Sequence, residues 1–251
     1  MRDIFRKRRM WRKRGELKDS YDVVIIGGGS HGLATAYYLA RDHGITDVAI
    51  LEKSYIGSGA AGRNTTILRS NYKTPEGARF YDASVKLYEG LSKELNFNLL
   101  FSQNGHLTLA HSDRAMFVMA NRAEVNRLHK IDSRLIYPDE IAELAPSMQV
   151  QNPDAVWPIQ GALYHPPGGV IRHDAVVWGF ARGADEGGAE IHPYTEVTGI
   201  TRDNGKVTGV RTNRGEINAP VVLNCTAGWS SLISDMAGVD MPITTHILQA
   251  S

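Results

Sequence analysis

The chain has 251 residues, of which 28 are lysine or arginine and 27 are aspartate or glutamate, so its formal net charge is only +1. Hydrophobic residues make up 42% of the sequence and charged residues 22%, proportions that exclude a chain disordered throughout. A single cysteine, Cys225, excludes an internal disulfide framework and any metal site built from several cysteines.

The charges are unevenly distributed. Residues 1–14 contain eight basic residues and one acidic residue, which leaves 20 basic and 26 acidic residues for the remainder. An acidic body argues against a protein that coats nucleic acid. We interpret residues 1–20 as a basic flexible tail, which is either a solvated arm or a docking arm for an acidic partner or a membrane surface. No apolar run is long enough for a membrane helix, and the N-terminus lacks the apolar core of a secretory signal, so we expect a cytoplasmic protein.

The first ordered elements predict a βαβ unit. Residues 23–26 are wholly apolar and β-branched, which is typical of a strand buried on both faces of a parallel sheet. A helix is predicted over 32–43 and a second buried strand over 48–51. Residues 53–66 are rich in glycine, serine, alanine and asparagine and predict a long loop, a kind of segment that is often functional.

Helices and short strands alternate along the rest of the chain. Helices are predicted over 75–95, with Phe80, Leu87 and Leu91 on one side, and over 113–130, 138–144, 173–186 and 229–237. Strands are predicted over 106–110, 162–164, 190–193, 221–223 and 241–248, together with a β-meander over 196–217 that turns at Asn204-Gly205. These elements predict an α/β fold class.

The clearest motif is Gly27-x-Gly29-x-x-Gly32, between the first strand and the first helix. Gly27 permits a sharp turn, Gly29 lets a pyrophosphate approach the backbone, and Gly32 lets the helix pack closely on the strand. The helix N-terminus attracts phosphate, and Glu52, at the end of the next strand, is placed to bind ribose hydroxyls and disfavours NADP. The alternative is a glycine-rich turn in an unrelated α/β fold.

The loop after Glu52 bears on which dinucleotide is bound. Most of residues 58–64 are small and allow a bulky ring to approach the backbone, which favours FAD over NAD. Arg69 follows the loop as a fixed cation or, in the simpler interpretation, as a surface cation. The histidines show no spacing typical of metal ligands, so no metal site is predicted, and no Ser–His–Asp nucleophile elbow is predicted either.

The chain resembles the D-amino-acid-oxidase-like FAD oxidoreductases and, within them, the β subunits of heterotetrameric sarcosine oxidases. The resemblance runs from Tyr21 to the last residue, and it is carried by residues 24–40, 62–69 and 168–178. It implies a Rossmann-like FAD-binding domain interleaved with an incomplete β-rich substrate domain. Within residues 21–251, FAD-binding segments are expected at about 21–80 and 160–230, and substrate-domain segments at about 96–150 and 240–251. Family members are considerably longer, so we expect a C-terminally truncated chain.

The resemblance also implies roles for particular residues. Arg69 faces the flavin, pairs with the substrate carboxylate and is the expected catalytic residue. His173 carries a covalently bound FMN, and Arg172 beside it offsets phosphate charge; from the residues alone, His173 is a polar residue at a helix N-terminus and Arg172 a solvated cation. Cys225 is interpreted as a small buried residue rather than a redox centre. The residues implied to contact noncovalent FAD are Gly27, Gly29, Ser30, His31, Gly32, Glu52, Lys53, Arg63, Asn64, Thr65, Thr66, Val197, Ala227 and Gly228.

The implied reaction is the oxidation of a secondary amine, sarcosine or a related N-methyl amino acid. The flavin accepts hydride from the N-methyl carbon, and the imine gives glycine and formaldehyde or passes its carbon to tetrahydrofolate. Electrons pass from FAD to FMN and then to oxygen, which gives hydrogen peroxide. The implied partners are α, γ and δ subunits of a hetero-oligomer. Two alternatives stay open: a single-subunit glycine or amino-acid oxidase or dehydrogenase, and a catalytically silent, truncated nucleotide-binding fragment.

Overall fold

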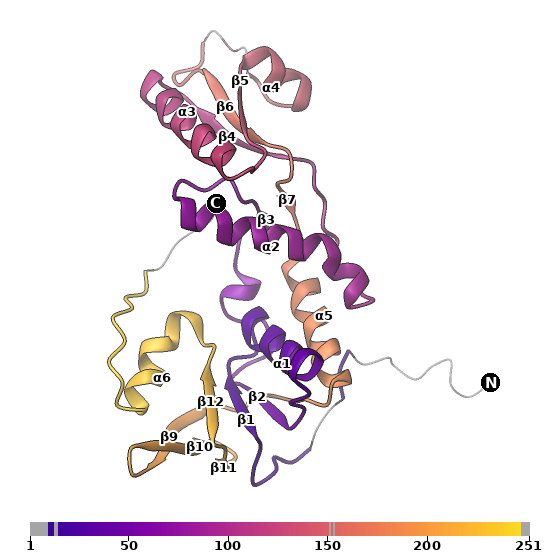
Figure 1. The fold of residues 1–251 in the computed structure, drawn as a ribbon, viewed down its shortest axis with the longest axis vertical. Helices are drawn as coiled ribbons and strands as arrows, with labels where there is room; N and C mark the ends of the chain where they lie inside the picture. Colours follow the sequence, from indigo (N-terminus) through magenta and orange to yellow (C-terminus); the bar gives the residue numbers. More distant parts are fainter. Residues whose placement is uncertain (1–9, 13–14, 151, 153, 247–251) are drawn as a thin grey trace, which may run out of the picture. The chain divides into compact units, whose positions relative to one another are not determined.

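The structure is a computed structural model that describes residues 10–12, 15–150, 152 and 154–246 (Figure 1). The chain forms two compact units: unit 1 consists of the residues up to Thr65 and from His173 onward, and unit 2 of Thr66–Arg172. Most of the predicted basic tail, residues 1–9, 13 and 14, lies outside the described residues. Within the described part, no helix is both long and apolar enough to cross a membrane.

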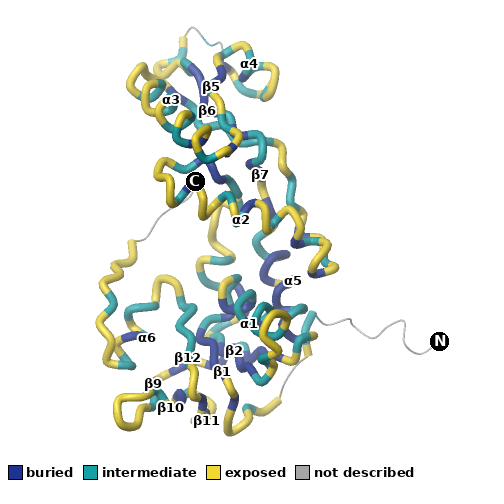
Figure 2. The backbone as a smooth tube through the Cα atoms, in the orientation of Figure 1, coloured by how far each residue is buried: buried dark blue, intermediate teal, exposed yellow. Residues whose placement is uncertain are grey.

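Unit 1 is built on a parallel sheet with the strand order β12-β1-β2-β8. Val24 in the central strand lies between Ala49 on β2 and Val222 on β12. All of β1 is buried (Figure 2), as the run of β-branched residues predicts for a strand covered on both faces. The strands are β1 (Val23–Ile26), β2 (Val48–Glu52), β8 (Glu190–Pro193) and β12 (Val221–Asn224). The predicted mixed α/β fold with a parallel sheet is confirmed.

One face of this sheet is covered by two helices, α1 (Ser30–His43) and α5 (His173–Glu186). They pack against each other, with the ring of Tyr37 5.9 Å from that of Phe180. Gly44 ends α1 in the left-handed conformation, at a φ of 66°, which is why a glycine stands there.

The other face is covered by an antiparallel sheet of β9 (Val197–Asp203), β10 (Lys206–Thr212) and β11 (Gly215–Asn218). Val24 and Leu51 of the parallel sheet share one buried cluster with Val210 of the antiparallel sheet. The predicted turn at Asn204-Gly205 joins β9 to β10, and both of its residues have positive φ.

A helical segment follows β12, formed by the short 3-10 helix η2 (Ala227–Trp229) and α6 (Ser230–Met236). The predicted strand over 241–248 is wrong in its described part, because residues 241–246 form no strand. Side chains satisfy the local backbone instead: Ser231 Oγ donates to the Ile243 carbonyl at 2.9 Å, and Thr245 Oγ1 donates to the Gly228 carbonyl at 2.8 Å. A strand needs a neighbouring strand to bond with, and this segment pairs with none among the described residues.

Unit 2 contains an antiparallel sheet with the order β4-β6-β5 and a two-stranded pair, β3 with β7. A core of Ile136, Ile141, Val150 and Ala162 lies against the three-stranded sheet. A Cβ on Gly161 of β6 would lie 2.7 Å from Met116 of α3, so that helix packs closely on the sheet. The elements are β3 (Ile67–Leu68), α2 (Pro75–Glu94), β4 (His106–Ala110), α3 (Asp113–Leu128), β5 (Arg134–Ile136), α4 (Pro138–Leu144), β6 (Gly161–His165) and β7 (Gly169–Val170).

The predicted inner face of α2 is only partly right. Leu91 is buried, but Phe80 is 69% exposed and Leu87 43% exposed. The rings of Phe80 and Tyr81 pack edge to face at 5.4 Å, and Tyr81 stacks on Tyr72 at 4.0 Å. These aromatic side chains bury area against one another at the surface rather than in the core.

His106 of β4 stands opposite His165 of β6. Burial, with smaller contributions from the positive charges of Arg69, His165 and Arg122, lowers the pKa of His106 from 6.5 to about 4. The imidazole is therefore neutral in the folded protein near pH 7.

Replacing His106 with glutamine should reduce the sensitivity of the fold to acid. Because the folded pKa lies below the unfolded one, His106 destabilises the wild type progressively as the pH falls from about 6.5 to about 4. Urea unfolding should show H106Q gaining free energy of unfolding relative to wild type between pH 7 and about 4.5. The exposed His43→Gln is the control. Parallel pH profiles for wild type and H106Q would contradict a neutral His106 in the fold.

Candidate cofactor site

The turn between β1 and α1 is held against the neighbouring strands. Gly27 has a φ of 111°, and its N–H donates to the Leu51 carbonyl at 2.8 Å. A Cβ on Gly27 would lie 2.5 Å from the Cys225 carbonyl oxygen, and a Cβ on Gly32 would lie 2.0 Å from the Gly27 carbonyl oxygen. Both positions therefore require glycine, one for the backbone conformation and both for the close approach of main chain.

Gly29 differs from these two glycines. Its φ of −85° suits any residue, and the atom nearest to a Cβ built there, in the side chain of Ala61, would be 3.8 Å away. Packing within the chain therefore does not require glycine at this position. The missing side chain instead leaves bare main chain at the wall of a cavity that Gly29 lines, which is what a bulky group approaching the backbone needs.

The N-terminus of α1 opens at the same place. No side chain caps the helix at Gly29, and its first turn contains no acidic residue. The first N–H groups of a 14-residue helix lack partners within the helix and carry partial positive charge, so this end favours an anion such as phosphate.

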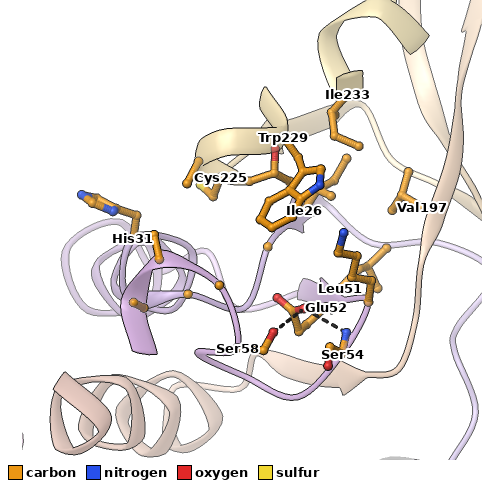
Figure 3. Close-up of a pocket in the computed structure, with 18 of the residues that line it drawn as sticks. Ile26, His31, Leu51, Glu52, Ser54, Ser58, Val197, Cys225, Trp229 and Ile233 are labelled. Carbon is orange, nitrogen blue, oxygen red and sulfur yellow. Dashed lines mark hydrogen bonds between the residues drawn. The ribbon is translucent and has the colours of Figure 1, made fainter. Parts of the chain in front are cut away.

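Glu52, at the end of β2, ties the turn to the following loop (Figure 3). Its Oε2 accepts a hydrogen bond from the Gly28 N–H at 2.9 Å, and its Oε1 accepts from the Ser54 N–H at 2.9 Å and the Ser58 hydroxyl at 3.4 Å. These donors fix the carboxylate beside the cavity. Each carboxylate oxygen has two lone pairs, so Oε2 retains acceptor capacity toward a hydroxyl pair.

The cavity beside this turn has a volume of about 380 Å³. Apolar side chains from three parts of unit 1 line it: Ile26 and Leu51 from the parallel sheet, Val197 from β9, and Trp229 from η2 (Figure 3). Lys53 Nζ lies 4.0 Å from the centroid of the Trp229 ring, which places a cation at the wall. A cavity that has an uncapped helix N-terminus and a fixed carboxylate at its wall suits a dinucleotide.

The far side of the cavity is shaped by the turn after β12. Asn224 Oδ1 accepts from the Thr226 hydroxyl at 2.7 Å, and Asn224 Nδ2 donates to the Ser230 carbonyl at 2.9 Å. Ala227 between them has a φ of 51°, an uncommon conformation for a residue with a side chain. Such strain is found where surrounding contacts over-determine the backbone, and here it brings main chain to the cavity.

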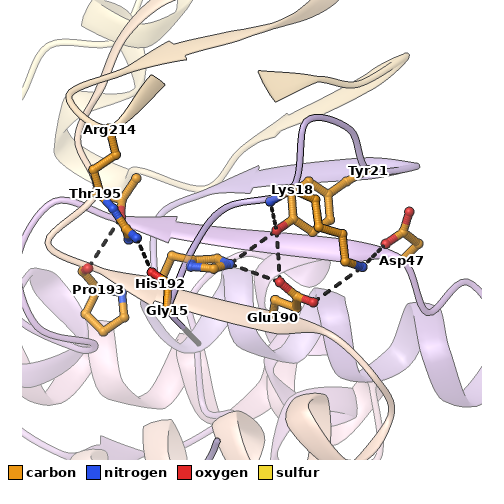
Figure 4. A network of polar contacts seen from close by, with 9 residues as sticks. All are labelled: Gly15, Lys18, Tyr21, Asp47, Glu190, His192, Pro193, Thr195 and Arg214. Carbon is orange, nitrogen blue, oxygen red and sulfur yellow. Dashed lines mark hydrogen bonds and ion pairs between the residues drawn. The ribbon is translucent and has the colours of Figure 1, made fainter. Parts of the chain in front are cut away.

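A polar network fixes the edge strand β8 and the turn that follows it (Figure 4). Tyr21 donates its hydroxyl to Glu190 Oε2 at 2.9 Å, and His192 Nε2 lies 3.3 Å from the same oxygen. Lys18 Nζ lies 2.7 Å from Asp47 Oδ1 and 3.3 Å from Glu190 Oε1. Burial raises the pKa of Tyr21 to about 12, so the hydroxyl stays protonated and can donate.

The turn after β8 meets the end of β2. The Thr195 N–H donates to the Glu52 carbonyl at 2.8 Å, and Arg214 donates to the Thr195 hydroxyl at 3.0 Å (Figure 4). These bonds place Val197, two residues further on, at the cavity wall.

The residues predicted to bind FAD, FMN or the substrate divide into three groups. The cavity is lined by Gly27, Gly29, Ser30, His31, Glu52, Lys53, Arg63, Val197 and Ala227. Gly32, Asn64, Thr65, His173 and Gly228 belong to unit 1 but lie outside that lining, and Thr66, Arg69 and Arg172 belong to unit 2. The roles assigned to these residues stay predictions.

The helical segment after β12 contributes four apolar residues to the cavity lining that the sequence did not mark as binding residues: Trp229, Leu232, Ile233 and Met236. They follow one another at helical spacing, so the periodicity itself was visible. The same spacing is typical of a helix face packed on a core, and the sequence does not distinguish a core from a cavity. Cys225 also lines the cavity; burial raises the pKa of its thiol, which fits a small packed residue better than a reactive thiolate.

His173, the first residue of α5, has a buried ring nitrogen. Its Nδ1 has no hydrogen-bond partner among the described residues. A buried imidazole nitrogen without a partner is uncommon and requires an explanation.

Known proteins that are similar to this chain indicate the family to which it belongs. The family profile described as FAD dependent oxidoreductase matches residues 22–250. A sarcosine oxidase subunit beta from Rhizobium meliloti is 51% identical over 240 residues, covering 96% of this chain and 57% of the relative. Another from Arthrobacter is 48% identical over 94% of this chain and 58% of the relative. The predicted resemblance is thereby confirmed, and the chain spans less than three fifths of the length of these relatives.

Solved structures agree on the fold. The crystal structure of L-proline dehydrogenase from P. horikoshii superposes with a TM-score of 0.81 at 32% identity, covering 89% of this chain and 57% of that one. Glycine oxidase from Bacillus cereus superposes with a TM-score of 0.74 at 27% identity, covering 86% of this chain and 58% of that one.

Alanine substitutions should separate the glycine needed for packing from the glycine that leaves space. Gly32→Ala drives a Cβ into the Gly27 carbonyl oxygen and should lower the free energy of unfolding by about 2 kcal/mol or more. Gly29→Ala brings its Cβ no closer than 3.8 Å to any other atom and should cost less than about 1 kcal/mol, the loss of a helix N-cap preference. Denaturant unfolding without added cofactor measures both. Equal destabilisation by the two variants would contradict this assignment.

Proposed function

The chain belongs to the family of FAD-dependent oxidoreductases, and from this premise we propose that it is the FAD-binding part of a hetero-oligomeric enzyme that oxidises sarcosine or a related N-methyl amino acid. The assignment of FAD as the cofactor rests on one observation: the main chain is bare at Gly29, beside an uncapped helix N-terminus and a fixed carboxylate. The names of the relatives support the substrate class, and the word subunit in them supports assembly with partners, which we propose to be α, γ and δ subunits.

The cavity offers groups suited to each part of FAD. The main chain from Gly29 to His31 would hold the diphosphate, because N–H groups at a helix N-terminus point toward an anion. Glu52 would accept hydrogen bonds from the ribose hydroxyls. The backbone at Val197 would contact the adenine, and Ala227 would bring main chain close to the dinucleotide.

The loop from 58 to 66 would approach the flavin end. Asn64 stabilises it by donating to the carbonyls of Ala60 and Ala61, at 3.2 and 2.7 Å, across the short 3-10 helix η1 (Ala60–Gly62). Gly62 is required there, since a Cβ would lie 2.4 Å from the Gly57 carbonyl oxygen. The order of this loop depends on its own backbone contacts, so it can present main chain to a ring.

When bound, FAD supplies the two-electron oxidant for the carbon next to the amine. Arg69 would bind the substrate carboxylate, because a guanidinium fork fixes both the position and the orientation of that group. We assign no side-chain base. The overall reaction converts sarcosine, oxygen and water into glycine, formaldehyde and hydrogen peroxide, with transfer of the one-carbon unit to tetrahydrofolate as the other fate of the imine.

His173 is the proposed attachment site of a second, covalent flavin, FMN. A buried Nδ1 without a partner among the described residues supports this, because a bond to a flavin requires a ring nitrogen that no other group engages. Arg172, the preceding residue, would offset phosphate charge.

A single-subunit amino-acid oxidase or dehydrogenase is the second candidate. The similarity to L-proline dehydrogenase and glycine oxidase structures favours it. The identities of 32% and 27% are well below the 51% shared with a sarcosine oxidase subunit beta, which is why sarcosine remains the first choice.

Anaerobic addition of amines to the purified flavoprotein tests the proposal. Sarcosine should bleach the flavin absorbance, and glycine and L-proline should not, because the N-methyl group is the one oxidised. Gly29→Ala should fold but retain less than about a tenth of the flavin, since its Cβ would occupy the space of the diphosphate. Bleaching by glycine or L-proline alone would support the second candidate. A protein that never retains flavin would refute both and favour a silent nucleotide-binding fragment.

Replacing His173 with asparagine should remove covalently bound flavin and leave noncovalent FAD in place. Flavin fluorescence of the denatured polypeptide on a gel reports the first, and flavin released into the supernatant reports the second. His31→Asn is the control, because that histidine is implied to contact only the noncovalent cofactor. Protein-linked fluorescence that survives in H173N would exclude His173 as the attachment site.

A further inference from the structure

In unit 2, two guanidinium groups donate hydrogen bonds to the side-chain amide of one asparagine. Arg69 Nη1 donates to Asn71 Oδ1 at 3.1 Å, and Arg122 Nη2 donates to the same oxygen at 3.1 Å. Arg122 Nε also donates to the main-chain carbonyl of Asn71. The guanidinium of Arg122 therefore forms two hydrogen bonds with Asn71, one to its main chain and one to its side chain. Because Oδ1 accepts from two cations, the orientation of the Asn71 amide is fixed.

The segment that carries Arg69 is rigid. Asn71 and Ser70 are fully buried. His165 Nδ1 lies 2.6 Å from the Asp132 carbonyl oxygen, so this nitrogen carries the proton and Nε2 accepts from the Ser70 N–H at 3.1 Å. The Arg69 guanidinium also lies 4.4 Å above the ring of Tyr72. Arg69 is therefore held by a stacked ring on one side and by Asn71 on the other.

The charges of Arg69 and Arg122 are not neutralised by any acidic side chain that the structure describes. Within the described residues, neither Arg69 nor Arg122 forms an ion pair with a carboxylate. Burial and the charge of Arg69 lower the pKa of Arg122, and both cations contribute to the low pKa of His106 nearby. Asn71 Nδ2 is buried and has no hydrogen-bond partner in the described part of the chain. A half-buried dication with unused N–H donors is the environment that an anion stabilises.

We propose that Arg122 is a positioning residue for a substrate carboxylate: acting through Asn71, it orients the guanidinium of Arg69 and adds a second positive charge beside it. This inference rests on the proposed function, in which Arg69 binds the carboxylate of an amino acid. Arg69 keeps most of its five N–H donors available, since only Nη1 is used on Asn71. The ligand class is a small monocarboxylate, because the proposed substrate, sarcosine, carries one carboxylate.

Three variants in the flavin-containing protein separate orientation from charge. Arg122→Gln should raise the KM for sarcosine roughly 10-fold, the effect of one lost charge-assisted interaction, and change kcat much less. Arg122→Lys keeps the charge but lacks the fork and should give an intermediate KM. Arg127→Gln on the same helix is the matched control, because its guanidinium pairs with Glu124 at the surface, and it should leave KM unchanged.

Asn71→Asp distinguishes a binding role from a structural one. The new carboxylate lies between both guanidinium groups, so the midpoint of thermal unfolding should stay the same or rise. The same carboxylate competes with the ligand for Arg69, so KM should rise at least as much as in Arg122→Gln. A structural role alone would not raise KM in a variant that is as stable as the wild type.

A readout without turnover keeps the test independent of the flavin assignment. Acetate should protect Arg69 from modification by phenylglyoxal, measured by mass spectrometry, and neutral acetamide should not. Protection should be lost in Arg122→Gln and Asn71→Asp, even if the protein retains no flavin, in which case the proposed function fails and this inference stands. Unchanged protection and unchanged KM in both folded variants would overturn the inference.

Discussion

The structure of unit 1 depends on the turn at the end of β1. Main-chain segments lie in close contact there. A Cβ on Gly27 would clash with the Cys225 carbonyl, and a Cβ on Gly32 would clash with the Gly27 carbonyl. These approaches bring together β1, β12 and α1, whose ends surround one cavity. The turn therefore sets both the packing of the sheet and the direction in which the helix N-terminus points, whereas packing does not require a glycine at position 29.

Much of this could be predicted from the sequence because it is local. The strand, turn and helix around Gly27–Gly32 are specified by β-branched residues, glycines at fixed spacing and Gly44 at the helix end. The wall formed by Trp229 and Met236 could not, because a helix face looks alike whether it meets a core or a cavity. The strand expected over 241–248 failed for a related reason: apolar alternation does not supply a partner strand, and side-chain bonds from Ser231 and Thr245 took its place.

Arg122 shows a different limit of the sequence. It lies 51 residues from Asn71, on a helix whose composition suggests only a solvated face, and no motif marks it. The topology of unit 2 brings it beside Arg69. Neither cation pairs with a carboxylate among the described residues, and this is why we propose that the pair binds an anion. In our proposals, unit 1 binds phosphate through bare main chain and unit 2 binds a carboxylate through guanidinium groups.

The central claim is that the Gly29 turn binds an adenine dinucleotide through main-chain N–H groups. Backbone amide NMR spectra recorded while ADP, the half of FAD that this turn would hold, is titrated into the protein test it most directly. We expect the largest shifts at the N–H groups of Gly29, Ser30 and His31, with smaller ones at the loop after Glu52. Saturable binding of ADP whose largest shifts lie elsewhere, with these three amides unmoved, would contradict it.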